Sequence, residues 1–209
     1  MLRSTSSRLN NTMFSPASLA ILLIVTLGAG CVSHDRRGEI PFGTWSGEGV
    51  FVYENWKQDG ENAVESEPRS LSRRYSTSLI IRPRELDGHD VIELEIVSNH
   101  GGMPDMDKET HLNVALVEAK RVSESMTLYR LVDFKFNPAP DSTLNYEEDG
   151  PPYAASCITS NGTTIFQIEY MENFVDTFRF YGRHVEKAGV YFDPKEGLVH
   201  WYEDLTKQQ

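Results

Sequence analysis

Arg130 is the residue whose position in the sequence most suggests binding chemistry. It falls in the same alternation as Val132 and Phe134 within the long apolar run 126–136, which predicts a guanidinium among inward-facing side chains. A buried guanidinium is costly unless an anion pairs with it, and a bound carboxylate or phosphate could supply that partner. Two alternatives stay open: Arg130 lies at a β-bulge, or it pairs with an acidic residue of the protein such as Glu169.

Arg179 and Tyr181 form a second candidate pair for an anionic group. One residue separates them, so both side chains are expected on the same face of a strand. We therefore regard Arg130, Arg179 and Tyr181 as the candidate ligand-binding residues.

The sequence carries no motif of a known type of active site or metal site. It contains neither Gly-x-Ser-x-Gly nor His-Glu-x-x-His, and two cysteines, Cys31 and Cys157, cannot build a cysteine-based metal site. The acidic residues Glu93 and Glu95 alternate with apolar residues and are expected to face water. The sequence favours a protein that is not an enzyme, with an enzyme left open as a third possibility, and we expect no bound metal or cofactor.

The N-terminal segment has the features of an export signal. Two arginines precede an uncharged stretch from Leu9 to Gly30, whose most apolar part, residues 19–25, is too short to span a bilayer. The stretch leads into Leu27-Gly28-Ala29-Gly30-Cys31, which resembles the lipobox of bacterial lipoproteins. The resemblance implies that residues 1–30 are removed and that Cys31 carries lipid, which would hold the protein on a membrane surface. An ordinary signal peptide with an unmodified cysteine, or an uncleaved anchor, is the alternative.

The expected location is therefore the cell envelope. Val32 follows the cysteine, so the lipoprotein pattern gives no signal for retention in the inner membrane and favours the outer membrane, facing the periplasm. The polar segment 31–41 is expected to be a tether between lipid and domain. If Cys31 is acylated, Cys157 has no partner within the chain and is expected to be a buried, inert thiol.

The charge of the chain excludes one class of partner. With 31 acidic and 20 basic residues the net charge is −11, and it becomes −13 without residues 1–30. A nucleic-acid-binding protein needs a basic surface for the phosphate backbone, so we expect no nucleic-acid partner.

Apolar and polar residues alternate with a period of two over residues 42–209, which predicts a single all-β domain. Asp87-Gly88 and Asn161-Gly162 are strong signals for tight hairpin turns. About ten strands are expected, at residues 43–53, 75–82, 91–97, 112–116, 126–136, 153–159, 163–170, 174–181, 185–192 and 198–205.

Short connections between these strands predict an antiparallel up-and-down β-barrel, because a meander removes its exposed edges by closing on itself. The last strand would pair with the first. Gly47 and Gly49 interrupt the first strand between Trp45 and Phe51, as expected for a strand that coils strongly in a closing barrel. A β-sandwich is the alternative fold.

The start of the first strand, Gly43-Thr44-Trp45, resembles the Gly-x-Trp signature of the calycin superfamily, the lipocalins and their relatives. The longer segment 43–49 is most similar to nitrobindin-type and fatty-acid-binding-protein-like barrels. This resemblance implies a ten-stranded barrel in which Trp45 plugs one end beneath an arginine of a late strand, either Arg179 or Arg183. It also likens Arg179 and Tyr181 to the Arg-x-Tyr pair with which fatty-acid-binding proteins hold a carboxylate.

The sequence departs from nitrobindin-type proteins directly after this segment, at residues 50–56, and their haem-binding histidine has no counterpart that can be aligned. Haem is therefore not carried over. His184 and His200 lie on late strands and are expected to be ordinary, partly exposed strand residues.

Together these observations predict a lipid-anchored envelope protein that binds a small apolar or amphipathic ligand inside a β-barrel, since barrels of eight to ten strands can enclose one small molecule. Two other functions stay open: a filled barrel that acts as an envelope scaffold or interaction module, and a haem-binding protein of the nitrobindin type.

Overall fold

The computed structural model describes residues 38–54, 71–101, 108–139, 141–193 and 197–209, which belong to one compact unit, Cys31–Gln209. The predicted signal segment, Cys31 and most of the predicted tether lie outside the described residues. No helix able to cross a membrane occurs within the described ranges.

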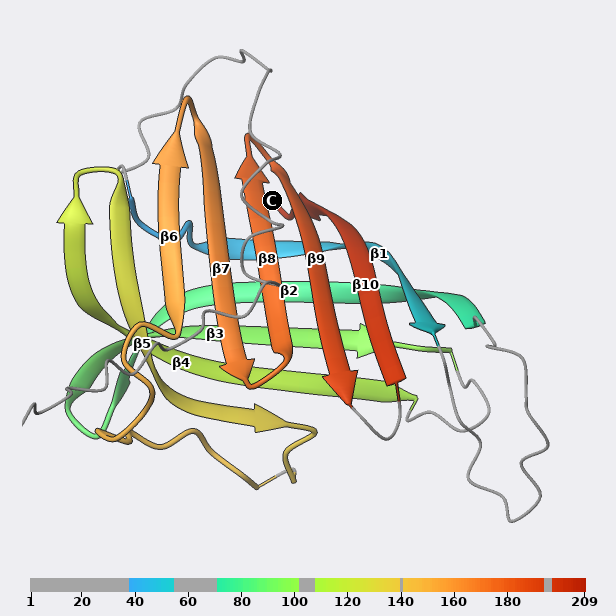
Figure 1. The fold of residues 1–209 in the computed structure, drawn as a ribbon, viewed down its shortest axis with the longest axis horizontal. Helices are drawn as coiled ribbons and strands as arrows, with labels where there is room; N and C mark the ends of the chain where they lie inside the picture. Colours follow the sequence, from blue (N-terminus) through green and yellow to red (C-terminus); the bar gives the residue numbers. More distant parts are fainter. Residues whose placement is uncertain (1–37, 55–70, 102–107, 140, 194–196) are drawn as a thin grey trace, which may run out of the picture. The chain divides into compact units, whose positions relative to one another are not determined.

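The described part of the chain forms ten antiparallel strands that follow one another around a closed barrel (Figure 1). In chain order the strands are β1 Gly43–Glu54, β2 Leu71–Leu86, β3 His89–Asn99, β4 Glu109–Ser123, β5 Met126–Phe136, β6 Ala155–Ser160, β7 Thr163–Met171, β8 Phe174–Tyr181, β9 His184–Asp193 and β10 Gly197–Lys207. The all-β up-and-down barrel is confirmed, and the β-sandwich alternative is wrong.

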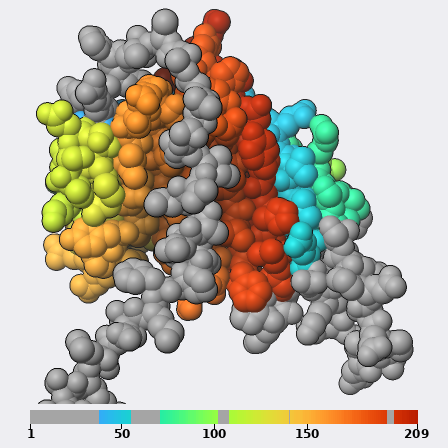
Figure 2. Space-filling model, turned by 45° about the horizontal axis from the view of Figure 1, so that its top comes forward, coloured from blue at the N-terminus to red at the C-terminus, as the bar shows by residue number. Residues whose placement is uncertain are grey.

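The barrel closes between its first and last strands. β1 pairs with β10 from Trp45 opposite Lys207 to Glu54 opposite Leu198. In the space-filling view the red of β10 lies directly beside the blue of β1 (Figure 2). Strands β6–β10 form one layer, and β1–β4 run across it in a second layer (Figure 1).

The two predicted hairpin turns have the backbone that their sequences favour. Asp87 and Gly88 have φ of 52° and 83°, and Asn161 and Gly162 have φ of 51° and 75°. A two-residue turn with positive φ at both positions matches the twist of the flanking strands, and asparagine, aspartate and glycine tolerate that conformation best.

Two strands are much longer than predicted. The strand expected at residues 112–116 is β4, which runs from Glu109 to Ser123. The strand expected at residues 75–82 starts at Leu71 and continues beyond Pro83 to Leu86, with Pro83 opposite Ile92 of β3. β2 pairs with β1 only as far as Ile81, so at Pro83 one side of the strand carries no strand partner. A proline is tolerated at such an edge because its missing N–H breaks no ladder hydrogen bond there.

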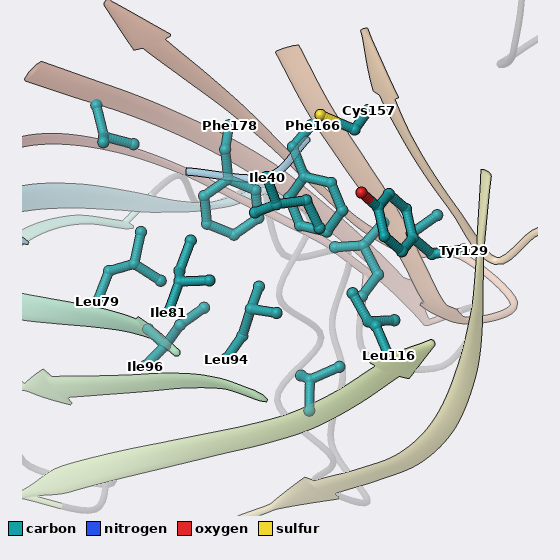
Figure 3. Close-up of a cluster of buried hydrophobic side chains, with 14 of the residues drawn as sticks. Ile40, Leu79, Ile81, Leu94, Ile96, Leu116, Tyr129, Cys157, Phe166 and Phe178 are labelled. Atoms are coloured by element: carbon teal, nitrogen blue, oxygen red, sulfur yellow. The ribbon is translucent and has the colours of Figure 1, made fainter. Parts of the chain in front are cut away.

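Half of the lumen is filled by an apolar core cluster. In Figure 3 Phe166 and Phe178 descend from one layer toward Leu79 and Leu94 of the other. The rings of Phe166 and Phe178 stack with centroids 5.5 Å apart, and both side chains are fully buried. Ile40, in the predicted tether, is 2% exposed and belongs to this cluster, so the end of that segment packs with the barrel.

A second, smaller cluster lies on the outside of the barrel. Leu86, Val91, Ala115 and Val132 form it together with Leu144 from the connection between β5 and β6. That connection, residues 137–154, is rich in acidic and polar residues, a composition that predicts a solvated loop. Its apolar side chains instead cover outward-facing residues of β3, β4 and β5.

Candidate ligand-binding site

The other half of the lumen contains a cavity of about 410 Å³, a volume within the range of small-molecule sites. Side chains from every strand except β6 contribute to its walls. The lining is largely aromatic and aliphatic: Phe51, Tyr53, Tyr75, Ile96, Ser98, His100, Thr110, Leu112, Phe136, Met171, Phe174, Asp176, Lys187, Tyr191, Val199, Trp201 and Glu203.

Three buried charged residues line this cavity: Asp176, Lys187 and Glu203, whose exposed fractions are 0%, 4% and 1%. They come from the neighbouring strands β8, β9 and β10, and Lys187 lies directly opposite Glu203 in the β9–β10 register. Charged side chains are seldom buried to this degree unless they are paired and hydrogen-bonded.

Glu203 and Lys187 form the closest ion pair of the group. Glu203 Oε1 accepts hydrogen bonds from Lys187 Nζ at 2.8 Å and from the Tyr75 hydroxyl at 2.7 Å. The Lys187 ammonium also lies 5.7 Å from the centroid of a Trp201 ring, within cation–π range.

Asp176 is held by three partners. Its Oδ1 accepts a hydrogen bond from Trp201 Nε1 at 2.8 Å, and its Oδ2 accepts one from the Tyr170 hydroxyl at 2.9 Å. Lys187 Nζ lies 3.6 Å from the same Oδ2. We call the six residues Tyr75, Tyr170, Asp176, Lys187, Trp201 and Glu203 the buried polar cluster.

Burial and the local charges shift the pKa values in this cluster. Burial raises the pKa of Asp176, the Glu203 carboxylate adds to the rise, and Lys187 opposes it. Burial lowers the pKa of Lys187, but Asp176 and Glu203 together outweigh that effect and leave it above the ordinary value. Burial, followed by the nearby carboxylates, also raises the pKa of Tyr75 and of Tyr170.

Two inward-facing glycines make room for the cluster. A Cβ atom on Gly189 would lie 2.1 Å from Asp176 Oδ1 and 2.2 Å from Trp201 Cε2. A Cβ on Gly49 would lie 2.7 Å from Cζ of Tyr75 and 2.8 Å from Cγ of Glu203. The strand glycines therefore let large polar side chains cross the barrel where other residues would exclude them.

One polar atom of the cluster stays unsatisfied. Glu203 Oε2 is buried and accepts no hydrogen bond from any residue that the structure describes. An unpaired buried acceptor costs about 1–3 kcal/mol, so this oxygen provides a strong attachment point for a donor.

Aromatic rings surround the cluster on the cavity side. Phe174 meets Trp201 edge to face at 5.6 Å and Tyr191 at 5.8 Å between centroids. Phe51 meets Tyr53 in the same manner at 4.9 Å. The cavity thus combines apolar walls with a charged anchor.

His100 lies in the same wall. Its Nε2 shares a hydrogen bond of 3.1 Å with Thr110 Oγ1, and its ring lies against those of Phe51 and Tyr75. The two histidines considered earlier lie elsewhere: His184 is exposed and stacks on Tyr181, and His200 alternates with the cavity residues Val199 and Trp201, on the outer face.

The inward orientation expected for Arg130 is wrong. Its guanidinium lies on the outer face, where it donates hydrogen bonds to the Glu148 carbonyl oxygen and to the Tyr146 hydroxyl. The inward residues of the first part of β5 are Tyr129 and Leu131, which belong to the core cluster.

A β-bulge explains the error. In the β4–β5 ladder, Leu131 pairs with Leu116 and Asp133 pairs with Ala115, so Val132 is an extra residue. The bulge shifts the alternation of inward-facing and outward-facing residues by one position. Val132 therefore faces outward, as Arg130 does, whereas Phe134 faces inward and packs against the core cluster. The alternative that Arg130 itself lies at a bulge is not met, because Arg130 pairs regularly with Val117 and the extra residue is Val132. Its partners are Glu148 and Tyr146 rather than Glu169.

Arg179 and Tyr181 share a face as expected, but that face is the outer one. Both contact Glu186 of β9: Arg179 Nη1 lies 3.2 Å from Glu186 Oε2, and the Tyr181 hydroxyl donates to Oε1 at 2.9 Å. The intervening Phe180 belongs to the core cluster inside. The pair therefore does not line the cavity.

The Gly-x-Trp signature has a structural role. Trp45 is 2% exposed and contacts Phe180 edge to face at 5.5 Å, so it does plug the filled end of the barrel. The cation above its ring is Lys207, with Nζ 5.2 Å from the ring centroid, rather than Arg179 or Arg183. A Cβ on Gly43, where φ is 153°, would lie 2.7 Å from Lys207 Cε.

Cys157 is fully buried, and burial raises the pKa of its thiol to about 12. A thiol of this kind is a poor nucleophile, in agreement with the inert role expected for it. Cys31 lies outside the described residues, and its lipidation stays a prediction.

Sequence reasoning missed the buried polar cluster, although a signal for it exists. Glu203 lies between Trp201 and Leu205 in the inward alternation of β10, and Lys187 follows Val185 in that of β9. Charged residues in the inward phase of two adjacent strands predict a buried ion pair.

Glu93, expected to face water, does lie on the outer face but is only 4% exposed. Arg82 Nε donates to Glu93 Oε2 at 2.6 Å, and Arg84 Nη1 donates to Oε1 at 2.5 Å. The two arginines cover the carboxylate.

Comparisons with known proteins give only distant structural likenesses. No family model matches the sequence, and no curated protein matches it. The barrel is similar to the structure of an S-type phycobiliprotein lyase (CPES) from Guillardia theta, with 8% identity and a TM-score of 0.44 over 80% of this chain and 88% of that chain. A TM-score below 0.5 gives no ground for transferring a function.

Proposed function

We propose that this protein binds a small apolar or amphipathic molecule in the open half of its barrel. The observation that carries the proposal is the 410 Å³ cavity, which has aromatic walls and an unsatisfied carboxylate oxygen. Small-molecule sites typically combine apolar walls with a few well-placed polar groups. The further proposal that the protein is lipid-anchored at Cys31 in the cell envelope rests on the lipobox-like sequence alone.

The full chain can be titrated with N-phenyl-1-naphthylamine, a neutral apolar dye whose fluorescence rises in a dry site. We expect saturable binding, and we expect Val199→Trp, which fills the cavity from β10, to weaken it at least tenfold. Val52→Trp is the matched control, because Val52 alternates with the cavity residues Phe51 and Tyr53 and so lies on the outer face of β1.

The scaffold alternative has one observation in its favour, since the core cluster fills the other half of the lumen. Absence of dye binding, or binding that Val199→Trp leaves unchanged, would support the scaffold and reject a ligand in the lumen. The lipid anchor is tested separately by incorporation of labelled palmitate, which we expect to be lost in Cys31→Ser.

A further inference from the structure

We infer that the ligand of this cavity carries a protonated amine on an apolar or aromatic body and that the amine donates a hydrogen bond to Glu203 Oε2. This inference rests on the proposed function and names the chemical class that the site would select.

The first argument is the hydrogen-bond state of Glu203. This side chain is 1% exposed and lines the cavity, and its Oε1 already accepts two hydrogen bonds. Its Oε2 accepts none from the described residues. An ionised carboxylate can only accept, so whatever completes this site has to be a donor.

The second argument is the balance of charge. Asp176 and Glu203 place two carboxylates around the single ammonium of Lys187. Burial raises the pKa of Asp176, and the nearby Glu203 carboxylate raises it further. A cation at Oε2 would bring the group to two negative and two positive charges, which burial in an apolar lumen favours over one unbalanced carboxylate.

The third argument is the aromatic lining of the cavity. Phe51, Phe174 and Trp201 line the cavity, and their rings offer the negative faces that attract ammonium groups. The net charge of −11 adds a long-range attraction for cations. A carboxylate ligand, by contrast, would meet Glu203 Oε2 with like charge and no hydrogen to donate.

A neutral hydroxyl group or a bound water can also donate to Oε2, but neither corrects the charge. Three probes with the same bicyclic body separate these cases: 2-naphthylmethylamine, 2-naphthalenemethanol and 2-naphthoate. Their affinities for the full chain are measured by isothermal titration calorimetry near neutral pH, where the amine is protonated and the acid ionised. We expect the amine to bind roughly 10- to 100-fold more tightly than the alcohol, and the carboxylate to bind most weakly.

The carboxylate is then replaced. Glu203→Gln keeps an oxygen for Tyr75 and Lys187 but puts an amide N–H₂ in place of Oε2, so the preference for the amine over the alcohol should disappear. Glu186→Gln is the matched control, because Glu186 lies on the outer face of β9 with Arg179 and Tyr181. It should keep the preference.

The outcomes separate this inference from the proposed function. If amine and alcohol bind equally, or if the preference survives in Glu203→Gln, the inference is wrong while a ligand in the lumen stands. If none of the naphthalene probes binds but N-phenyl-1-naphthylamine does, the inference again fails alone. If no probe binds, the proposed function fails as well. Should Glu203→Gln not fold, the comparison of the three probes in the unsubstituted chain decides.

Discussion

Single residues decide what the lumen can hold. Gly189 leaves the space in which Trp201 reaches Asp176, and Gly49 leaves the space in which Tyr75 reaches Glu203. Each glycine faces inward beside large side chains, Trp201 at Gly189 and Tyr75 at Gly49. The polar cluster therefore depends on the absence of two Cβ atoms as much as on its own hydrogen bonds.

Gly189→Ala tests this dependence. The new Cβ would overlap Asp176 Oδ1 and the Trp201 ring, so we expect the Trp201–Asp176 hydrogen bond to break and the free energy of unfolding to fall by about 1–3 kcal/mol. Urea unfolding and the tryptophan emission maximum measure the two effects. Ala188→Ser, at the adjacent exposed position, serves as the control and should change neither. A Gly189→Ala variant with an unaltered unfolding free energy and emission maximum would show that the barrel accommodates a Cβ atom at this position.

At the scale of elements, the bulge in β5 determines which side chains enter the barrel. It turns Val132 outward, where this residue joins the outer cluster with Leu144 of the β5–β6 connection. Two residues of β5 then bind the same connection. Arg130 donates a hydrogen bond to the Tyr146 hydroxyl, and Asp133 accepts one from the backbone N–H of Asn145. The bulge in β5 therefore lets the acidic β5–β6 connection pack against the outer face of the barrel.

Gly150→Ala is expected to loosen this connection without opening the barrel. A Cβ on Gly150 would lie 1.8 Å from the carbonyl oxygen of Leu131, so the segment has to move away from β5. We expect a loss of stability of about 1–3 kcal/mol. Hydrogen exchange should become faster at the amide of Glu147, which donates to the Val132 carbonyl, and stay slow in the β1–β10 ladder.

Asp141→Ala, at an exposed position of the same connection, is the control for this variant and should leave both measurements unchanged. Exchange that becomes faster throughout the barrel in Gly150→Ala would mean that the connection is needed for closure itself.

At the scale of the whole molecule, the barrel is closed, and its lumen is packed in one half and encloses a cavity in the other. The β1–β10 pairing leaves the ladder without a gap, and the core cluster occupies one half of the lumen while the buried polar cluster borders the cavity in the other. Apolar burial supplies the main driving force of such a fold, and the polar cluster adds a dependence on pH.

Stability should fall in alkaline solution. The pKa values of Tyr75, Tyr170 and Lys187 are all raised in the folded state, above ordinary values of 10.0 for tyrosine and 10.5 for lysine. Each group therefore keeps its proton longer when folded than when unfolded. The stability that these protons provide is present below about pH 10 and is lost above it, by up to about 1.4 kcal/mol per pH unit for each group.

Urea unfolding measured from about pH 8 to about pH 11.5 tests this prediction, and the loss should be shallower in Tyr75→Phe. An unfolding free energy that stays constant over this range would contradict the assigned protonation states.

The sequence by itself determined the strands, the tight turns and the closed barrel. Alternation with a period of two is a local property, and Asn-Gly and Asp-Gly select their turns with no help from the rest of the chain. The position of Trp45 in the plug was implied by the resemblance of residues 43–49 to a known barrel signature, not by alternation.

Only the tertiary structure decided which polar residues face the lumen. The bulge at Val132 depends on how β5 pairs with β4, and it reversed the side of the barrel on which Arg130 lies. Tyr75 of β2 meets Asp176, Lys187 and Glu203 of β8–β10 only because β1 pairs with both β2 and β10, and Gly49 and Gly189 leave room for these side chains. Local alternation indicates that Lys187 and Glu203 face inward, but register is fixed by the packing of the whole barrel, so the sequence could not show that Tyr75 and Asp176 meet them.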